Sequence, residues 1–399
     1  MFCKMFHKKK TKTDRKVSKK LITKKNSTEL FFLQDTCGLN VCLKDQTDLA
    51  DFSSLEDKNQ DTDSHHFTSD QSKVQSDDIK GPLIGDHETQ ESEGGEVDLL
   101  KHRGDCKKNP GHSQFIPIDT FSLKHLPEGF QDTDLYEYIK VTADLTVRVG
   151  VEMTSPHRPK FWPKTTQPYP FYNISERRNL RTGSGSAWRV FKIQDGVRQN
   201  GGDRRTDYTK CWCKKCEVSD SPSNVWWEFD VNTATHVVFD DCEANHTTLR
   251  LFYDRDGSPV VNVDKVSVID VNIEHDWCWL KSVTCDKSLG NKLMEMCKHH
   301  ESVWMKVLDK YFDSRSKHKL NVIVSHPHGC SKQVSVGQWK DRLEVDGRSK
   351  FTYTTCTCSG SSGAYVYCLG YFNYLTWSDL VHSGSFKSGL NYSGVSLVQ

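Results

Sequence analysis

Short apolar runs recur along the last two thirds of the chain, separated by turn residues such as Gly, Pro, Asn and Asp. These runs are too short for helices, and several of them alternate with polar residues, as strands do. Many short strands with turns between them favour an all-β barrel or sandwich, so the pattern predicts a mostly β fold. The expected strands are residues 145–151, 187–193, 229–238, 248–253, 260–271, 277–283, 320–324, 333–336 and 364–369.

Two stretches repeat at helical spacing instead. Residues 288–312 place apolar side chains three or four positions apart, which predicts a long helix with one buried face. Residues 134–140 predict a short helix, and a glycine turn at 181–185 is expected to lead into the second strand. We expect the stripe of the long helix to face the core and not a partner; its members are Leu289, Leu293, Met296, Cys297, His300, Trp304, Val307, Leu308 and Tyr311.

The N-terminal part has neither pattern. Residues 1–25 hold ten lysines and Arg15 against one acid, Asp14, whereas residues 51–100 are acidic and rich in Ser and Gln. The net charge of +1 and the mean hydropathy of −0.66 average over these blocks. Because neither block can bury enough apolar surface to offset its ordering entropy, we expect residues 1–110 to be a disordered tail and residues 111–399 to form one domain.

The lysine-rich block has two interpretations: a solvated tail, or a signal for nuclear import or for contact with an anionic surface. We find no apolar run with a small-residue cleavage site at the start and no stretch of 18 apolar residues. We therefore expect no membrane span, and an intracellular protein in the cytoplasm or nucleus.

A candidate nucleophile lies in the stretch 356–368. There Ser362 follows Gly360 and Ser361 and precedes Gly363. Glycines permit a tight turn whose backbone N–H groups can point at a carbonyl oxygen. Taken alone, such a cluster is more often an ordinary turn.

A serine nucleophile needs a base, and the base needs a carboxylate to orient it. His236 follows an apolar strand and a turn of small residues, and Asp276 stands directly before another apolar strand. The order His236, Asp276, Ser362, with gaps of 40 and 86 residues, is the order of the chymotrypsin arrangement and not of the subtilisin or α/β-hydrolase arrangements.

Here the chain resembles the trypsin-like serine proteases of the chymotrypsin fold (PA clan) over about residues 145–399. Thr233-Ala234-Thr235-His236 resembles their Thr-Ala-x-His, and Gly360-Ser361-Ser362-Gly363 stands for their Gly-Asp-Ser-Gly. The resemblance implies two β-barrels of the six-stranded type joined by the helix at 288–312. It also implies a serine endopeptidase that acts on a protein or peptide substrate and requires no cofactor.

The resemblance implies a role for each motif residue. Ser362 attacks the scissile carbonyl, His236 moves the proton, Asp276 orients the imidazole, and the N–H groups of Gly360 and Ser362 form the oxyanion hole. Thr235, Ser361 and the pair Ala364-Tyr365 depart from the trypsin pattern, although none of them removes a catalytic group.

Two features, one departure from trypsin and one further resemblance, point to the HtrA, glutamyl-endopeptidase and viral 3C-like branches. Ser361 replaces the aspartate that pairs with a new N-terminus in trypsin-like zymogens, so we expect no activation of that kind. The stretch 325–329, Ser-His-Pro-His-Gly, resembles a turn before a second-barrel strand in those branches. His326 and His328 also fit a metal site, but we favour the turn.

The stretch Leu380–Gly384 is a partial match to the strand that forms one wall of the S1 pocket in glutamyl endopeptidases and viral 3C-like enzymes. There a histidine contacts the P1 Glu or Gln, so the resemblance makes His382 a substrate-binding residue that favours Glu or Gln at P1. Ser383, Gly384 and Cys356 are placed in the same substrate-binding group. The alternative is that His382 is simply a surface-strand histidine.

The chain has 15 cysteines, but with no secretory signal these do not indicate a disulfide framework. Cys211, Cys213 and Cys216 could bind a structural zinc ion with Cys242, Cys356 or Cys358 as a fourth ligand, or form a reduced loop.

Three competing functions stay open. A protease-like binding or scaffold protein would keep the fold without turnover. A zinc-stabilised interaction protein would act through the Cys211–Cys216 loop. A nucleic-acid-binding protein would act through the lysine-rich tail.

Overall fold

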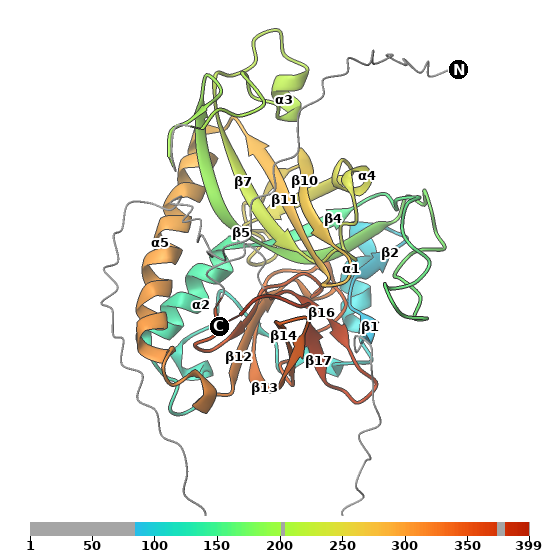
Figure 1. Cartoon of the computed structure of the whole chain (residues 1–399), viewed down its shortest axis with the longest axis vertical. Coiled ribbons are helices and arrows are strands. Elements are labelled where there is room, and N and C mark those ends of the chain that lie inside the picture. Colours follow the sequence, from blue (N-terminus) through green and yellow to red (C-terminus); the bar gives the residue numbers. More distant parts are fainter. Residues whose placement is uncertain (1–83, 201–203, 373–379, 399) are drawn as a thin grey trace, which may run out of the picture. The chain divides into compact units, whose positions relative to one another are not determined.

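A computed structural model describes residues 84–200, 204–372 and 380–398 (Figure 1). The lysine-rich block and the rest of residues 1–83 lie outside the described residues, so the expectation of a disordered tail there stays a prediction. Among the described helices, none combines the length and the apolar character needed to cross a membrane.

The strands form two curled sheets, each a half-barrel, as the pattern of short apolar runs predicted. The first sheet has the strand order β10-β11-β7-β5-β4-β8-β9, with β2 and β6 paired to β5. Its neighbouring strands run antiparallel. The strands are β2 (Gln90–Ser92), β4 (Thr146–Val151), β5 (Leu180–Gln194), β6 (Val197–Arg198), β7 (Val225–Thr233), β8 (Thr247–Leu251), β9 (Val261–Val263), β10 (Val266–Asn272) and β11 (Trp277–Thr284).

The second sheet has the order β1-β16-β17-β14-β13-β12-β15, with β3 paired to β13. It too is antiparallel. Its strands are β1 (Asp86–His87), β3 (Ile116–Pro117), β12 (Leu320–Ser325), β13 (Gln333–Val345), β14 (Arg348–Tyr353), β15 (Val366–Cys368), β16 (His382–Ser385) and β17 (Asn391–Ser393). The predicted mostly β fold is therefore confirmed.

The strand predictions were wrong in detail at four places. The strand expected over 229–238 ends at Thr233, and His236 follows it in a turn. The glycine turn expected at 181–185 lies inside β5, where Gly185 fits beside Val231 and Asn232 of β7. The single strand expected over 260–271 is divided into β9 and β10. The strands β14 and β17 were not expected, because their alternation includes Lys, Ser and Asn that become buried only in the assembled sheet, whereas β16 lies where the resemblance at Leu380–Gly384 implied a strand.

The expected long helix is α5 (Lys287–Tyr311), whose N-cap Asp286 accepts hydrogen bonds from the N–H groups of Ser288 and Leu289. It runs alongside α2 (Thr133–Leu145), which extends beyond the short helix expected at 134–140 (Figure 1). Its apolar stripe faces the core, as predicted, because Leu289 and Leu293 pack on the first sheet and Val303 and Val307 pack beside α2.

Residues 84–110 correct the predicted tail boundary. They form β1, β2 and α1 (Glu96–Gly104). The two strands pair with β16 and β5 respectively. Composition misled here because this polar segment needs no core of its own when its backbone hydrogen bonds are completed by existing sheets.

A buried ion pair supports the turn that carries His236. Glu243 of α4 (Asp241–Ala244) accepts hydrogen bonds from Arg158 at 2.7 Å on each carboxylate oxygen. Arg158 also donates to the main-chain oxygen of His236 at 3.1 Å. Arg181 lies 3.1 Å from the same carboxylate. Burial opposes ionisation of Glu243, but the two arginines outweigh it and lower the pKa of its carboxyl.

We expect Glu243→Ala to lower the free energy of unfolding by about 3–5 kcal/mol, because it leaves buried arginines without their counter-charge. Urea denaturation of the purified chain measures this. The matched control is Lys164→Ala, which removes the solvent-exposed pair with Glu274 and should leave the midpoint nearly unchanged. Equal effects of the two substitutions on the midpoint would contradict the stabilising role of the buried Glu243 ion pair.

Candidate active site

The structure brings together the three residues that the sequence order singled out. His236 lies in the turn after β7, Asp276 in the turn before β11, and Ser362 in the loop before β15. Nε2 of His236 is 2.7 Å from Oγ of Ser362. Its Nδ1 is 2.9 Å from both carboxylate oxygens of Asp276. All three residues are buried, and the contacts form one hydrogen-bonded chain from carboxylate to hydroxyl.

Further contacts fix Asp276. Its Oδ1 accepts a hydrogen bond from the backbone N–H of His236 at 3.2 Å, and its Oδ2 accepts one from the hydroxyl of Ser383. Ser383, expected among the substrate-binding residues, thus has its side chain on the carboxylate. Asp276 itself adopts a φ of 57°, in the left-handed region where aspartate is tolerated.

The loop around Ser362 depends on its glycines. Gly360 and Gly363 have φ values of 92° and 83°, which favour glycine. A Cβ on Gly360 would lie 2.5 Å from the main-chain oxygen of His326. Between them, Oγ of Ser361 lies 3.2 Å from Oγ of Ser325 and accepts the N–H of Cys358 at 3.2 Å. The side chain of Ser361 therefore stabilises the loop through these two hydrogen bonds.

The two N–H groups expected to form an oxyanion hole converge on one carbonyl oxygen. The main-chain oxygen of Glu88 accepts the N–H of Gly360 at 2.5 Å and that of Ser362 at 3.3 Å. The N–H of Glu88 donates to Oγ of Ser362 at 3.0 Å. A peptide carbonyl of this chain thus lies where such a site holds the carbonyl under attack.

The side chain of Glu88 is buried against His382. One carboxylate oxygen is 2.8 Å from Nε2 of His382, whose Nδ1 is 2.7 Å from the hydroxyl of Tyr353. The other carboxylate oxygen pairs with Nζ of Lys108. Lys108 in turn donates to Asn391 at 2.7 Å and to Thr357 at 3.2 Å. His382 is fully buried, so it is not a surface-strand histidine.

The electrostatics of this pocket favour a carboxylate. Burial opposes ionisation of Glu88, but the hydrogen bond and charge of His382 and the Lys108 ammonium outweigh it, and the pKa of Glu88 falls well below its usual range. Burial lowers the pKa of His382 despite the hydrogen bond to Glu88. A neutral His382 can donate from Nε2 to the carboxylate and accept the Tyr353 hydroxyl at Nδ1.

Backbone pairing continues on both sides of Glu88. His87 and Asp86 pair antiparallel with Gly384 and Ser385 of β16. A Cβ on Gly384 would lie 2.0 Å from the oxygen of Asp86, so glycine allows the close approach. On the other side, Gln90 pairs with Thr182 of β5.

Sequence reasoning missed Glu88, Lys108 and Tyr353. Glu88 and Lys108 lie in the segment assigned to the tail, and no local pattern distinguishes them there. Tyr353 ends β14, a strand that was not expected. Cys356, expected to bind substrate, instead hydrogen-bonds through its thiol to Asn109 at 2.9 Å.

A first cysteine cluster forms beside the first sheet. Cys211, Cys213 and Cys216 lie with Cys285, and their sulfur atoms are all within 4.8 Å of one another. The expected fourth members were wrong. Cys242 lies outside this set, Cys356 packs with Phe115, and Cys358 belongs to a second cluster. Cys285 follows β11 and is brought in by the sheet, which sequence spacing could not show.

The second cluster joins Cys106, His112, His328 and Cys358, whose ligand atoms also lie within 4.8 Å of one another. His326 is separate from it: its Nδ1 is 2.9 Å from the oxygen of Cys330, and its ring stacks on Tyr253. The expected turn is present at Pro327–Gly329, and the strand β13 follows it. His328 therefore belongs to both the turn and the cluster.

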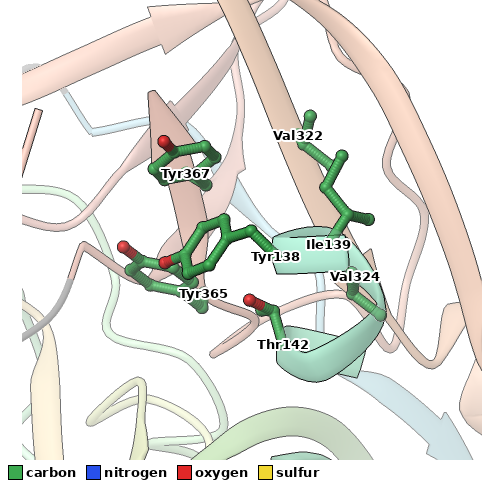
Figure 2. A pocket seen from close by; sticks show the side chains of 7 residues that line it. All are labelled: Tyr138, Ile139, Thr142, Val322, Val324, Tyr365 and Tyr367. Carbon is green, nitrogen blue, oxygen red and sulfur yellow. The ribbon is translucent and has the colours of Figure 1, made fainter. Parts of the chain in front are cut away.

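A small cavity lies away from these residues, between α2 and the strands β12 and β15 (Figure 2). Its volume is about 10 Å³, which is room for one water molecule at most. It is lined by Tyr138, Ile139, Thr142, Val322, Val324, Tyr365 and Tyr367. It is a packing gap and not a ligand site.

Comparison with known proteins gives structural similarity only. No protein-family model and no curated protein matches the sequence. The HtrA-type protease AlgW with decapeptide is 12% identical with a TM-score of 0.32, and the match covers 65% of this chain and 63% of AlgW. Rv3671c protease from M. tuberculosis is 12% identical, with a TM-score of 0.32 over 66% and 82% of the chains. Deg5 is 12% identical, with a TM-score of 0.33 over 68% and 91%. Scores this low carry no argument about function, which rests on the geometry above.

Proposed function

We propose that this chain is a serine endopeptidase that forms an acyl-enzyme through Ser362. The observation that carries the proposal is the hydrogen-bonded chain from Asp276 through His236 to Ser362, set beside two N–H groups that share one carbonyl oxygen. A nucleophile, its base, the orienting carboxylate and an oxyanion site are the groups that acyl transfer requires.

The roles follow from the contacts. His236 Nε2 takes the Ser362 proton as Oγ attacks the carbonyl carbon, and later gives it to the leaving amine. Asp276 holds the ring with Nδ1–H toward the carboxylate and stabilises the imidazolium. The N–H groups of Gly360 and Ser362 stabilise the developing oxyanion, at about 3–4 kcal/mol per donor in comparable sites.

The substrate class is a peptide or protein with Glu at P1. His382 and Lys108 supply two hydrogen-bond donors to a carboxylate, and the positive charge of Lys108 compensates its burial. A P1 glutamine could use the donor on His382 but gains no ion pair with Lys108. The pocket therefore favours Glu over Gln.

We expect a fluorophosphonate probe to label Ser362 in the full-length chain. Residues 86–90 cover the site in the intact chain, so among intact chains labelling should be faster in Glu88→Ala, which loses the contacts with His382 and Lys108. Ser362→Ala and His236→Ala should remove labelling, and the neighbouring Ser359→Ala should keep it. Gel fluorescence measures all of these.

If folded wild-type and Glu88→Ala chains both stay unlabelled, the endopeptidase proposal fails, and a protease-like binding protein without turnover becomes the better description.

We expect Lys108→Met to reduce kcat/KM for a P1-Glu peptide about tenfold, the low end for a charged hydrogen bond because Lys108 is partly exposed. The P1-Gln peptide should change little. In the wild type the Glu-to-Gln ratio should be constant above pH 5 and fall as the free P1 carboxyl protonates near pH ~4.3. The ratio falls toward low pH because the pocket binds the ionised carboxylate: His382 and Lys108 lower the pKa of the bound carboxyl, as they do for Glu88. An equal loss for both peptides would contradict the role of Lys108.

We further propose that Cys211, Cys213, Cys216 and Cys285 bind a structural zinc ion. Four thiols converge there among the buried side chains of Ile193, Trp226 and Val283, and a closed set of four cysteines is a typical structural zinc site. Metal analysis of the purified chain should show that Cys285→Ser loses one zinc ion relative to the wild type, and that Cys297→Ser does not. Equal zinc content in the two variants would remove this proposal.

A further inference from the structure

We propose that the chain cuts itself between Glu88 and Thr89. This inference rests on the endopeptidase function proposed above, and it names the enzyme's own residues 86–90 as a substrate. The argument uses the backbone register on each side of the bond, the recognition of the Glu88 side chain and the placement of its carbonyl group.

The segment before the bond lies as an acyl-side substrate strand would. Asp86 and His87 pair antiparallel with Ser385 and Gly384, on the strand that begins at His382. The N–H of Gly85 extends the contact by donating to the Tyr392 hydroxyl at 3.0 Å. Pairing of an extended peptide with a free strand edge uses main-chain hydrogen bonds and fixes the register. The register here places Glu88, and not a neighbour, at the nucleophile.

The segment after the bond is held by the other sheet. Gln90, Glu91 and Ser92 pair antiparallel with Thr182, Arg181 and Leu180 of β5. The Glu88–Thr89 bond therefore lies where the chain passes from the second sheet to the first, in front of Ser362. Strand pairing on both sides of a single peptide bond holds it in the orientation that attack requires.

Recognition and reactivity coincide at one residue. The carboxylate of Glu88 contacts His382 and Lys108, while its carbonyl oxygen accepts the N–H groups of Gly360 and Ser362. An inhibitory segment needs only to cover the site. This segment also presents a carbonyl to both oxyanion donors and fills the P1 pocket with the side chain that the pocket favours.

The reaction balances with water as the only co-reactant. Oγ of Ser362 bonds to the carbonyl carbon of Glu88 and its proton passes to His236. The C–N bond to Thr89 breaks, and the Thr89 nitrogen takes that proton to become a free amine. Water then adds to the ester, His236 returns a proton to Ser362, and Glu88 leaves with a new carboxylate.

Self-cleavage would also open the site. Before the cut, residues 86–90 cover Ser362 and exclude other peptides. After it, residues 1–88 are a separate fragment that can dissociate, whereas Thr89 begins a chain that keeps β2, Lys108 and the rest of the pocket. The cut would thus convert a covered enzyme into one open to other substrates with Glu at P1.

The test uses the full-length chain. We expect intact-mass analysis of purified wild type to show two fragments, 1–88 and 89–399, with Thr89 as the new N-terminus. Ser362→Ala should stay intact. Glu88→Lys should also stay intact. It should still hydrolyse a P1-Glu peptide, because the loss of the contacts with His382 and Lys108 releases residues 86–90 from the site. The matched control Glu93→Ala, an exposed acid on the same segment, should be cut like the wild type.

A mixing experiment distinguishes cutting within one chain from cutting between chains. Tagged Ser362→Ala chain should stay intact when wild type is added at equal concentration, and the rate of wild-type cutting should not change on dilution. Cutting of the tagged chain at a rate that rises with wild-type concentration would overturn the intramolecular reaction.

The outcomes separate this inference from the function beneath it. An intact wild-type chain whose Glu88→Lys variant hydrolyses P1-Glu peptides overturns self-cleavage and makes residues 86–90 an inhibitor, while the endopeptidase stands. If the wild type does not cut itself and the folded Glu88→Lys variant does not hydrolyse peptides, both the self-cleavage and the endopeptidase proposals are removed. A cut at any bond other than Glu88–Thr89 overturns the register argued here.

A second inference rests on different residues. We infer that Cys106, His112, His328 and Cys358 bind a zinc ion. Sγ of Cys106 is 3.6 Å from Sγ of Cys358, which is 3.5 Å from Nε2 of His112, and that atom is 3.1 Å from Nε2 of His328. A zinc tetrahedron with ordinary bond lengths has edges of about 3.8, 3.6 and 3.3 Å for these atom pairs.

The surroundings of these four groups suit a metal site. Nδ1 of His328 is 2.9 Å from Oε1 of Gln90, so it can donate to this outer partner while Nε2 faces the cluster. Nδ2 of Asn109 donates to Sγ of Cys358 at 3.0 Å. The ion would tie the turn that carries Lys108 to the loop that carries Ser362.

Metal analysis tests this site on the full-length Ser362→Ala chain. We expect two zinc ions per chain, and one after Cys106→Ser or His112→Ala; the neighbouring buried thiol Cys356→Ser is the matched control and should keep both. After chelation, Zn²⁺ alone should protect Cys106 and Cys358 from alkylation, a readout that needs no variant to fold. Unchanged zinc content in the folded variants, or alkylation of both thiols at the same rate with and without Zn²⁺, would overturn the site.

Discussion

The seam between the two sheets is the contact on which the site depends. The N–H of Ser184 in β5 donates to the main-chain oxygen of Ser362 at 2.8 Å, and its hydroxyl donates to that of Gly360 at 2.9 Å. His236 and Asp276 follow strands of the first sheet, whereas Ser362 precedes a strand of the second. Because a shift of one ångström can lose most of the effect of positioned catalytic groups, the registry across this seam sets the geometry of the proposed triad.

The N-terminal segment of the described chain completes what the two sheets begin. It supplies Glu88 to the pocket, Lys108 to the carboxylate, and Cys106 and His112 to a cluster with His328 and Cys358. A buried carboxylate is tolerated only with such partners. The pocket and its occupant are therefore built from a part of the chain that composition alone assigned to solvent.

The sequence predicted the class of fold well because strands and the long helix carry local signals. The apolar stripe from Leu289 to Tyr311 has the periodicity of a helix, and the alternation at 145–151 has that of a strand, so each is recognised within its own stretch. Predicting β14 and β17 failed for the opposite reason. Lys350 and Asn391 are buried by neighbours distant in sequence, so their burial leaves no local pattern.

For the candidate site, the sequence by itself determined the reactive groups, because small-residue turns, glycines with a left-handed backbone and the order of His236, Asp276 and Ser362 are local or ordinal features. Only the tertiary structure decided which groups complete it. Glu88 meets His382 across 294 residues of sequence, Lys108 and Tyr353 bind this pair from other elements, and Cys285 reaches Cys213 across 72 residues. Such contacts are fixed by sheet register, which no short stretch of sequence contains.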